Sequence, residues 1–174
     1  GDDTTDYQEM RYEGYGPGGI AVIVEALTDN RNRTASEVRA AFNKFNGSLG
    51  ETGSVSFMFE RMGQVVFAVE IGDPDAVFEA AFEAGASDVA SDDDGHTIYC
   101  DPSDFGQVSE ALSEQFGDPR EASLIWKPGN TIELDEHKGG SLLKLIDTLE
   151  DSDDVQTVAA NFEIADDVME RLVA

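Results

Sequence analysis

The chain has 174 residues and a formal net charge of −26, from 37 acidic and 11 basic side chains. Hydrophobic residues make up 40% of the sequence, which is enough for one medium domain or two small ones and argues against a disordered chain. No run of 18 apolar residues is present, so we expect no membrane contact. A surface this acidic repels phosphate at long range, which argues against nucleic-acid binding by the surface as a whole.

The charge is unevenly distributed along the chain. Residues 1–62 carry 10 acidic and 6 basic side chains, residues 63–128 carry 15 and 2, and residues 129–174 carry 12 and 3. Four of the basic residues lie within 31–44, where Glu37 is the single acid. Because salt screens charges beyond about 8 Å under physiological conditions, a local basic patch can persist on an acidic molecule.

The chain opens with a predicted strand, residues 8–13, then a glycine-rich stretch and a second strand, residues 20–27. From Gly14 to Gly19 the letters GYGPGG fit the G-x-G-x-x-G pattern of dinucleotide-binding folds. That pattern needs a helix at its last glycine, because the pyrophosphate rests on the helix N-terminus. The β-branched run IAVIV follows instead, so we expect no cofactor and a tight connection between strands. In an alternative interpretation, this loop and its tyrosines, Tyr12 and Tyr15, meet a partner.

A polar stretch, TDNRNRT, separates the second strand from the first predicted helix. Thr34 and Glu37 have the spacing of a capping box, which predicts that the helix begins at Thr34. Asn46-Gly47 predicts its end. Its apolar side consists of Ala35, Val38, Ala41, Phe42 and Phe45. Residues 54–59, SVSFMF, are predicted to form a further strand.

The next region, residues 63–128, predicts the order β-α-β-β-α-β. The expected strands are 64–71, 87–91, 96–101 and 122–127, and the expected helices are 74–84 and 102–116. The first of these helices has a predicted apolar face of Val77, Phe78, Ala81 and Phe82. This order is the ferredoxin-like plan.

The last region predicts a strand at 131–134, an amphipathic helix through Leu142 and Leu149, a strand at 155–161 and a short tail helix. Residues 1–62 have too few helices to cover a sheet face, and residues 129–174 offer the missing helix and strand. We therefore expect an α+β protein of two domains. An α/β domain forms from 1–62 plus 129–174, and a ferredoxin-like βαββαβ domain, 63–128, is inserted into it.

The acidic runs and histidines do not predict a metal site. In residues 90–101, Ala90 stands where an EF-hand loop needs its first aspartate, so we reject calcium binding there. His96 and His137 have no ligand partner at zinc spacing. Cys100 is the single cysteine, so no internal disulfide forms, and it is expected to be a small buried hydrophobe. No nucleophile elbow is present, and we predict neither a cofactor nor a catalytic residue.

The stretch YEGYGPGG, the later DNRNRT and GSLGETGSVSFMF, and the tail LLKLIDTLEDSDDVQTVAAN resemble the YebC/PmpR family of transcriptional regulators. The resemblance covers nearly the whole chain. It implies an α/β domain with an inserted ferredoxin-like domain, and a link to DNA-binding transcriptional control or to translation on the ribosome. It also implies a basic N-terminal helical domain, which has no counterpart in these residues. We therefore expect that domain to be missing and to carry most of the contact with DNA, RNA or the ribosome.

The resemblance assigns no chemistry to single residues, so the candidate contacts rest on the residue types. Arg31 and Arg33 flank a predicted helix N-terminus, where free amides and the helix dipole favour phosphate. Pairing of these arginines with the abundant carboxylates is the simpler expectation, and phosphate contact is the functional alternative. The candidate contact residues are Tyr15, Gly16, Pro17, Gly18, Gly19, Asn30, Arg31, Asn32, Arg33 and Arg39.

Together these features predict a cytoplasmic regulator of gene expression that acts by binding and is not an enzyme. The acidic inserted domain is expected to avoid phosphate and to face a basic protein partner. The chain alone is expected to bind duplex DNA weakly or not at all at about 150 mM salt. The alternative is a small-ligand-sensing or protein-interaction module without nucleic-acid contact.

Overall fold

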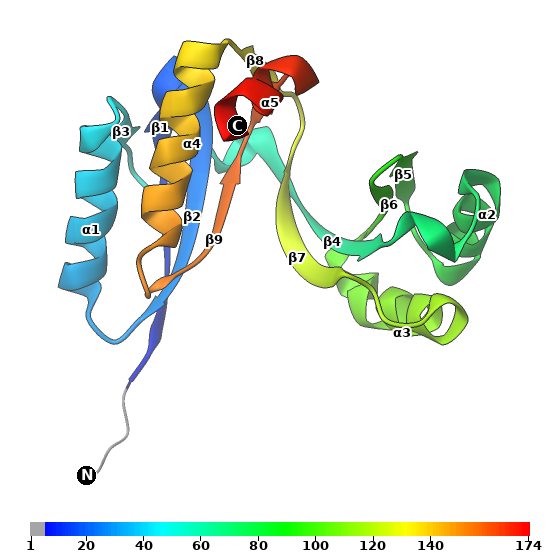
Figure 1. Cartoon of the computed structure of the whole chain (residues 1–174). Coiled ribbons are helices and arrows are strands. Elements are labelled where there is room, and N and C mark those ends of the chain that lie inside the picture. The colour runs from blue at the N-terminus through cyan, green and yellow to red at the C-terminus, as the bar shows by residue number, and fades with distance from the viewer. Residues whose placement is uncertain (1–5) are drawn as a thin grey trace. The chain divides into compact units, whose positions relative to one another are not determined.

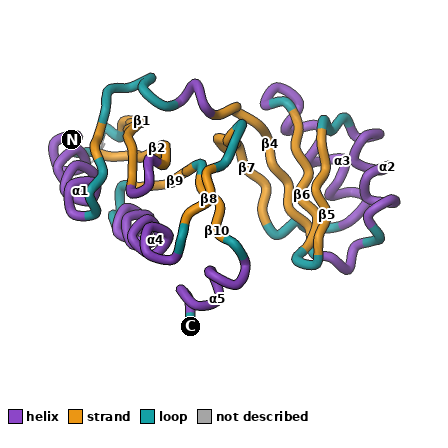
Figure 2. The backbone as a smooth tube through the Cα atoms, turned by 90° about the horizontal axis from the view of Figure 1, so that it is seen from above, coloured by secondary structure: helices purple, strands orange, loops and turns teal. Residues whose placement is uncertain are grey.

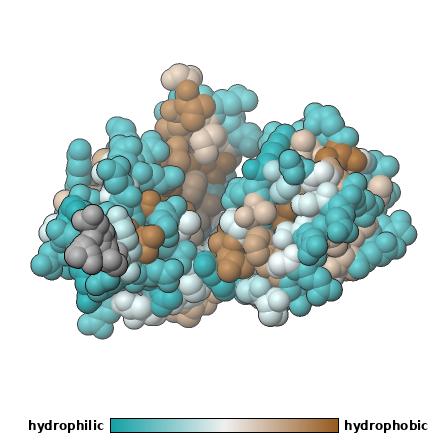
Figure 3. Space-filling model, turned by 90° about the horizontal axis from the view of Figure 1, so that it is seen from below, coloured by the Kyte–Doolittle hydropathy of each residue, from teal (hydrophilic) through white to brown (hydrophobic). Residues whose placement is uncertain are grey.

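Five consecutive apolar residues at the start of strand β2 (Ile20–Thr28) are fully buried, and they mark the centre of one of two units in the computed structural model (Figure 1). The structure describes residues 6–174. The first unit contains the residues up to Glu60 together with Pro128–Ala174, and the second unit is Arg61–Lys127. Hydrophilic residues cover most of the face shown in Figure 3, and hydrophobic ones gather in a few patches. No described helix is long and apolar enough to cross a membrane.

The first unit is built on a four-stranded sheet with the order β3-β1-β2-β9. β1 (Gln8–Gly16) pairs antiparallel with β2, and β2 pairs antiparallel with β9 (Val155–Ala160). The short β3 (Ser48–Leu49) pairs antiparallel with β1 at the outer edge. The strands predicted at 8–13, 20–27 and 155–161 are confirmed. Since the last part of the chain supplies the strand beside β2, the unit is necessarily discontinuous in sequence.

Two helices, α1 (Arg31–Lys44) and α4 (Glu136–Glu150), cover one face of this sheet (Figure 2). Alternate residues of β2 point toward them, as the period-2 pattern of a strand requires. The fully buried leucines of α4, spaced at three and four residues, meet the same cluster. The core comprises Ile20, Val22, Val24, Val38, Ala41, Phe42, Leu134, Leu142, Leu145 and Leu149.

Residues near the C-terminus add a small parallel sheet and a helix to the first unit. β8 (Ile132–Leu134) pairs with β10 (Phe162–Ile164), and α5 (Asp166–Val173) follows. Gly139 of α4 lies where a Cβ would come within 3.4 Å of Leu172, so the glycine admits a close approach of α5. β10 and the pairing of β8 with it were not predicted from the sequence.

The second unit has the ferredoxin-like arrangement. Its sheet has the order β5-β6-β4-β7, and the helices connect β4 to β5 and β6 to β7. The elements are β4 (Phe59–Phe67), α2 (Pro74–Ala84), β5 (Asp88–Asp92), β6 (Gly95–Cys100), α3 (Phe105–Phe116) and β7 (Glu121–Pro128). The core comprises Val65, Phe67, Val77, Ala81, Ala86, Ile98, Cys100, Val108 and Leu112. Cys100 is a buried free thiol, as predicted.

Three predictions about the second unit and the segment that precedes it are wrong. Residues 54–59 are not a strand: a 3-10 turn occupies Ser56–Met58, and β4 begins only at Phe59. The strand predicted at 64–71 ends at Phe67 and is followed by a 3-10 turn at Val69–Ile71. In helix α2 the buried stripe is Val77, Ala80 and Ala81, and Phe78 and Phe82 face solvent instead of the core.

The turn at 56–58 has a specific cause in the buried side chain of Glu13. This carboxylate in β1 is fully buried and accepts the backbone N–H groups of Gly53 (2.7 Å), Val55 (3.1 Å) and Ser56 (2.7 Å). Arg11 also donates to it through Nε at 3.0 Å. Backbone donors held by a side chain cannot join a strand ladder, so the segment turns before β4 starts.

The acidity of Glu13 reflects the same contacts. Burial by itself raises the pKa of this carboxyl, but the three backbone N–H donors lower it by more, so its pKa lies below the ordinary value. A carboxyl whose pKa is lowered by folding stabilises the fold above its unfolded pKa, and that stabilisation is lost as the pH falls through the folded pKa.

Glu13→Gln is therefore expected to lower the free energy of unfolding by about 1–3 kcal/mol at neutral pH, because an amide NH₂ then faces backbone donors. Urea denaturation measures the change. The exposed Glu9→Gln on the same strand is the matched control and should leave stability nearly unaltered. The difference between wild type and Glu13→Gln should shrink below a pH of about 4, and a difference that persists in acid would contradict this account.

Candidate nucleic-acid interface

The predicted contact residues fall at two separate places in the first unit. Tyr15 to Gly19 form the end of β1 and the turn into β2, whereas Asn30 to Arg33 begin α1 after β2 has ended. β2 spans nine residues, so the two places lie at opposite ends of a strand roughly 25–30 Å long (Figure 1). The structure thus does not bring the glycine turn together with the start of α1.

The glycine turn is confirmed as a tight connection between strands. A 3-10 turn at Pro17–Gly19 links β1 to β2, and no helix begins at Gly19. A Cβ at Gly14 would lie 2.6 Å from the carbonyl oxygen of Ser48, and one at Gly18 would lie 2.6 Å from Leu134 Cδ2. Gly18 also has a positive φ of 80°. These glycines are therefore needed for close packing, which leaves partner contact at this turn a prediction.

Helix α1 begins at Arg31, three residues earlier than predicted. Its N-cap is Asn30, whose side-chain oxygen accepts the N–H of Arg33 at 3.1 Å. Thr34 is not the cap, because it already lies inside the helix: its backbone N–H donates to the carbonyl oxygen of Asn30 at 3.2 Å. Its buried hydroxyl donates to Asp154 at 2.7 Å. The predicted capping box of Thr34 and Glu37 is consequently wrong. The arginines at 31 and 33 lie within the first helical turn and not in a loop before it.

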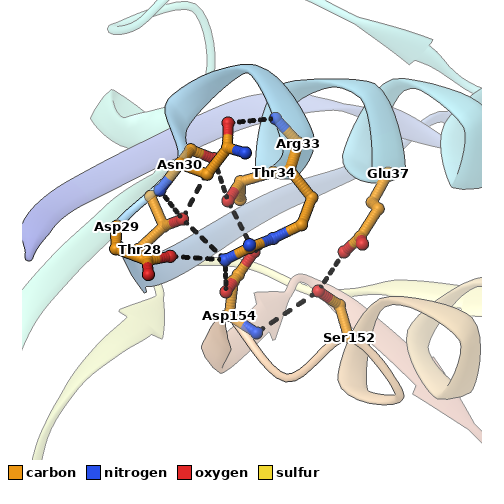
Figure 4. A network of polar contacts seen from close by, with 8 residues as sticks. All are labelled: Thr28, Asp29, Asn30, Arg33, Thr34, Glu37, Ser152 and Asp154. Atoms are coloured by element: carbon orange, nitrogen blue, oxygen red, sulfur yellow. Dashed lines mark hydrogen bonds and ion pairs between the residues drawn. The ribbon is translucent and has the colours of Figure 1, made fainter.

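Arg33 is held by two carboxylates (Figure 4). Its Nε and one terminal nitrogen donate to the two oxygens of Asp154 at 3.0 and 2.8 Å, and that nitrogen also donates to Asp29 at 2.8 Å. Asp154 is 8% exposed and lies in the turn between α4 and β9. The contacts fasten the start of α1 to a segment 121 residues further along the chain. We call this group of residues, Arg33, Thr34, Asp29 and Asp154, the α1 clamp.

The clamp changes the acidity of its members. The Arg33 guanidinium lowers the pKa of Asp154 below its ordinary value, against the opposing effect of burial. The carboxylates of Asp154 and Asp29 raise the pKa of Arg33 in turn. The charge of Arg33 is thus matched by two carboxylates of the protein, as the simpler expectation from the sequence had it, which makes a phosphate contact by Arg33 less favourable.

Arg31 and Arg39 differ from Arg33 in this respect. Both are exposed, and neither forms an ion pair with another residue of 6–174. The one acid in α1, Glu37, accepts a hydrogen bond from Ser152 on the side of the helix that faces the α4–β9 turn (Figure 4). The remaining exposed stripe, at three- and four-residue spacing, consists of Asn32, Ser36, Arg39 and Asn43. We call these four residues together with Arg31 the α1 face.

A cleft of about 550 Å³ lies beside the first turn of α1. Its lining includes Arg31 and Asn32 and also the acidic residues Asp6 and Asp29. Tyr12 of β1 also lines it, and its hydroxyl is buried with no hydrogen-bond partner in the described part of the chain. Burial raises the pKa of this phenol, so it stays a neutral donor.

Sequence reasoning missed three buried polar groups that organise the unit. Glu13 and Asp154 are described above, and Asn161 accepts the N–H of Ala21 at 2.8 Å through its side chain. No local pattern identifies them, since each satisfies donors at least 40 residues away. Across residues 6–174 no cluster of three or more His, Cys, Asp or Glu is arranged to hold a metal ion. His96 is buried, with its ring nitrogens near Ser91 and the carbonyl of Val69.

The contacts of the α1 clamp are expected to contribute to the free energy of unfolding. Asp154→Asn should lower the free energy of unfolding by about 1–2 kcal/mol at neutral pH, because it removes the charge that Arg33 and Thr34 contact. Because folding lowers the pKa of Asp154, the effect should be full above a pH of about 4 and fade below it. Chemical denaturation across pH measures this. Asp153→Asn, an exposed neighbour in the same turn, is the control, and an equal loss in both variants would refute the clamp.

Comparison with known proteins is consistent with this architecture. Residues 7–162 match the family model described as "TACO1/YebC second and third domain". A solved structure, the crystal structure of a conserved hypothetical protein Aq1575 from Aquifex aeolicus, has 42% sequence identity and a TM-score of 0.87. The similarity covers 95% of this chain and 69% of that one. By both sequence and fold, the chain belongs to the TACO1/YebC family.

Proposed function

We propose that this chain regulates gene expression by binding, and that its α1 face contacts the phosphate backbone of a nucleic acid. Members of the family are generally regulatory and associated with nucleic acids. The observation that carries the finer proposal is the α1 face itself. In a chain with a net charge of −26, the α1 face carries two arginines, two asparagines and a serine and no carboxylate.

The residue types on this face suit phosphate. Arginine forms charge-assisted bonds to phosphate oxygens, and asparagine and serine add neutral donors, which is the composition of contacts that fix position without reading sequence. Arg31 stands in the first turn, where the helix dipole also favours an anion. A backbone contact of this kind would be independent of base sequence.

The two units would then have different partners. The second unit, Arg61–Lys127, has 15 acidic and 3 basic side chains and would repel phosphate, so its partner is expected to be a basic protein. Under this proposal the chain works in the cytoplasm, either on DNA as a transcriptional regulator or on the ribosome as a translation factor. The chemistry needed is binding alone, without a cofactor or a catalytic residue.

The double variant Arg31→Glu/Arg39→Glu should weaken binding to a short single-stranded RNA or a duplex DNA by about tenfold or more at low salt. The plot of log affinity against log salt has a negative slope, and this slope should become shallower by about 2 in the variant. The reason is that each of the two arginines neutralises one phosphate in the wild-type protein. Fluorescence anisotropy at several salt concentrations measures both quantities. An acid at position 31 suits a helix N-terminus, so the fold should tolerate the change.

The matched control compares two single variants. Arg39→Glu and Lys144→Glu reverse the charge of an exposed side chain in the middle of α1 and of α4, and neither side chain forms an ion pair within residues 6–174. Only Arg39→Glu should weaken binding. Equal losses would show that net charge alone is responsible, and the α1 face would lose its special role.

Co-sedimentation with ribosomes distinguishes the two versions of the proposal. The ribosome-associated version expects wild type to pellet with ribosomes, and Arg31→Glu/Arg39→Glu to stay in the supernatant. Treatment with nuclease should release the wild-type protein, because the contact is to RNA. Retention on duplex DNA with no ribosome binding would favour the transcriptional version.

A further inference from the structure

Helix α2 of the second unit presents an unusual face to solvent. Phe78 is 52% exposed and Phe82 is 44% exposed. Their ring centroids lie 4.5 Å apart with the planes tilted by 36°, so the rings form one continuous apolar platform. Helix positions four apart lie one above the other, which is why the two rings meet. Paired exposed aromatic rings of this kind are typical of interaction surfaces.

Small residues on the opposite side of α2 explain why the rings point outward. Val77, Ala80 and Ala81 pack the helix against the sheet, and Ala81 is fully buried. Rotating the helix to bury two phenyl rings would force it away from the sheet and would expose Val77, which belongs to the core. The outward placement is therefore fixed by the packing of the helix and leaves the platform uncovered.

A row of carboxylates lies beside the platform. Asp75, Glu79 and Glu83 share this side of the helix with the rings, at positions i, i+4 and i+8, and all three are exposed. None forms an ion pair with a residue of 6–174. We call these three residues with Phe78 and Phe82 the α2 face.

The second unit cannot neutralise this face with its own cations. The second unit, Arg61–Lys127, contains three basic side chains. Arg61 lies 5.0 Å from the centroid of the Trp126 ring. Arg120 donates to the carbonyl oxygen of Asp94 at 2.6 Å, and Lys127 lies 4.5 Å above the ring of Tyr99. The α2 face therefore offers aromatic rings and uncompensated negative charge together, which is a combination that requires a partner with both cationic and apolar character.

We propose that the α2 face binds an arginine-rich segment of another protein. A guanidinium group stacks on an aromatic ring and pairs with a carboxylate through its planar fork, so one arginine can use both components of the face at once. Lysine has a compact, strongly hydrated charge and gains less from the rings. Nucleic-acid bases also stack on exposed rings, but the same carboxylates repel the phosphates that accompany them.

This inference deepens the proposed function, in that it gives the acidic second unit a partner chemistry and a place to bind it. It does not depend on the α1 face: phosphate binding at α1 can fail while arginine binding at α2 stands, because the two are measured with different ligands and different variants.

The test is fluorescence anisotropy of the full chain with a short labelled peptide of arginine and leucine. Wild type should bind this peptide more tightly than its lysine analogue. Phe78→Ala/Phe82→Ala should weaken binding by about tenfold and leave the salt dependence nearly unchanged, since it removes the rings and keeps the charges. Glu79→Gln/Glu83→Gln should weaken binding and flatten the salt dependence. All four positions are exposed, and circular dichroism checks that each variant is folded.

Glu110→Gln/Glu114→Gln is the matched control, because these exposed acids lie one turn apart on α3 of the same unit. This variant should bind the peptide as wild type does. The proposal is overturned if wild type does not bind, if the control loses as much affinity as Glu79→Gln/Glu83→Gln, or if the phenylalanine variant binds unchanged. It is also overturned if the phenylalanine variant abolishes binding of a single-stranded RNA, or if it dissolves a dimer seen by sedimentation, which would make a second copy the occupant.

Discussion

The contact between Arg33 and Asp154 decides how the first unit presents its charges. It joins the first turn of α1 to the turn before β9, two segments that the chain separates by the entire second unit. A bidentate guanidinium–carboxylate pair has a defined geometry, so it fixes the orientation of the helix start as well as its position. With Arg33 bound to Asp154 and Asp29, α1 turns its acid, Glu37, toward Ser152 and leaves Arg31 and Arg39 without an ion pair within residues 6–174. The composition of the α1 face is thus a consequence of the clamp.

The net charge of −26 and the cationic α1 face are compatible because they act over different distances. Long-range repulsion of phosphate by the whole molecule is screened beyond about 8 Å at physiological salt. Direct contacts between an arginine and a phosphate oxygen are much shorter than that. A surface of this kind disfavours nonspecific accumulation on nucleic acids and retains local contacts where shape permits them. Under the proposed function, the acidic majority of the chain would therefore favour specific contacts with a nucleic acid over nonspecific ones.

The sequence predicted the parts of the fold that depend on local patterns, and it failed where distant groups intervene. The strands of the central sheet and the βαββαβ order follow from periodicity and turn residues, which neighbouring residues determine. The capping box at Thr34 had the correct spacing, but Asp154 competes for the threonine hydroxyl from 120 residues away. Glu13 likewise converts part of 54–59 into a turn. Buried carboxylates that satisfy distant donors leave no periodic signal, so a single sequence does not reveal them.

The candidate surfaces show the same division between local and distant information. Residue types alone drew attention to Arg31, Arg33 and Arg39, but only the folded chain separates the arginine that is already paired from the two that are not. For α2 the sequence was misleading, because helical spacing groups Phe78 with Val77 and places both in the core. In the folded chain the buried stripe consists of small residues, and the rings are left outside among carboxylates.

The two proposed surfaces suit ligands of opposite charge. The α1 face suits phosphate, and the α2 face suits arginine-rich protein. A bare nucleic acid offers phosphate to the α1 face but is repelled by the acidic α2 face. A basic protein alone offers arginine to the α2 face but is repelled by the arginines of the α1 face. Both chemistries occur together where basic proteins lie on nucleic acid. A nucleoprotein is consequently the class of target that would engage both units of this chain, and free duplex DNA would engage one.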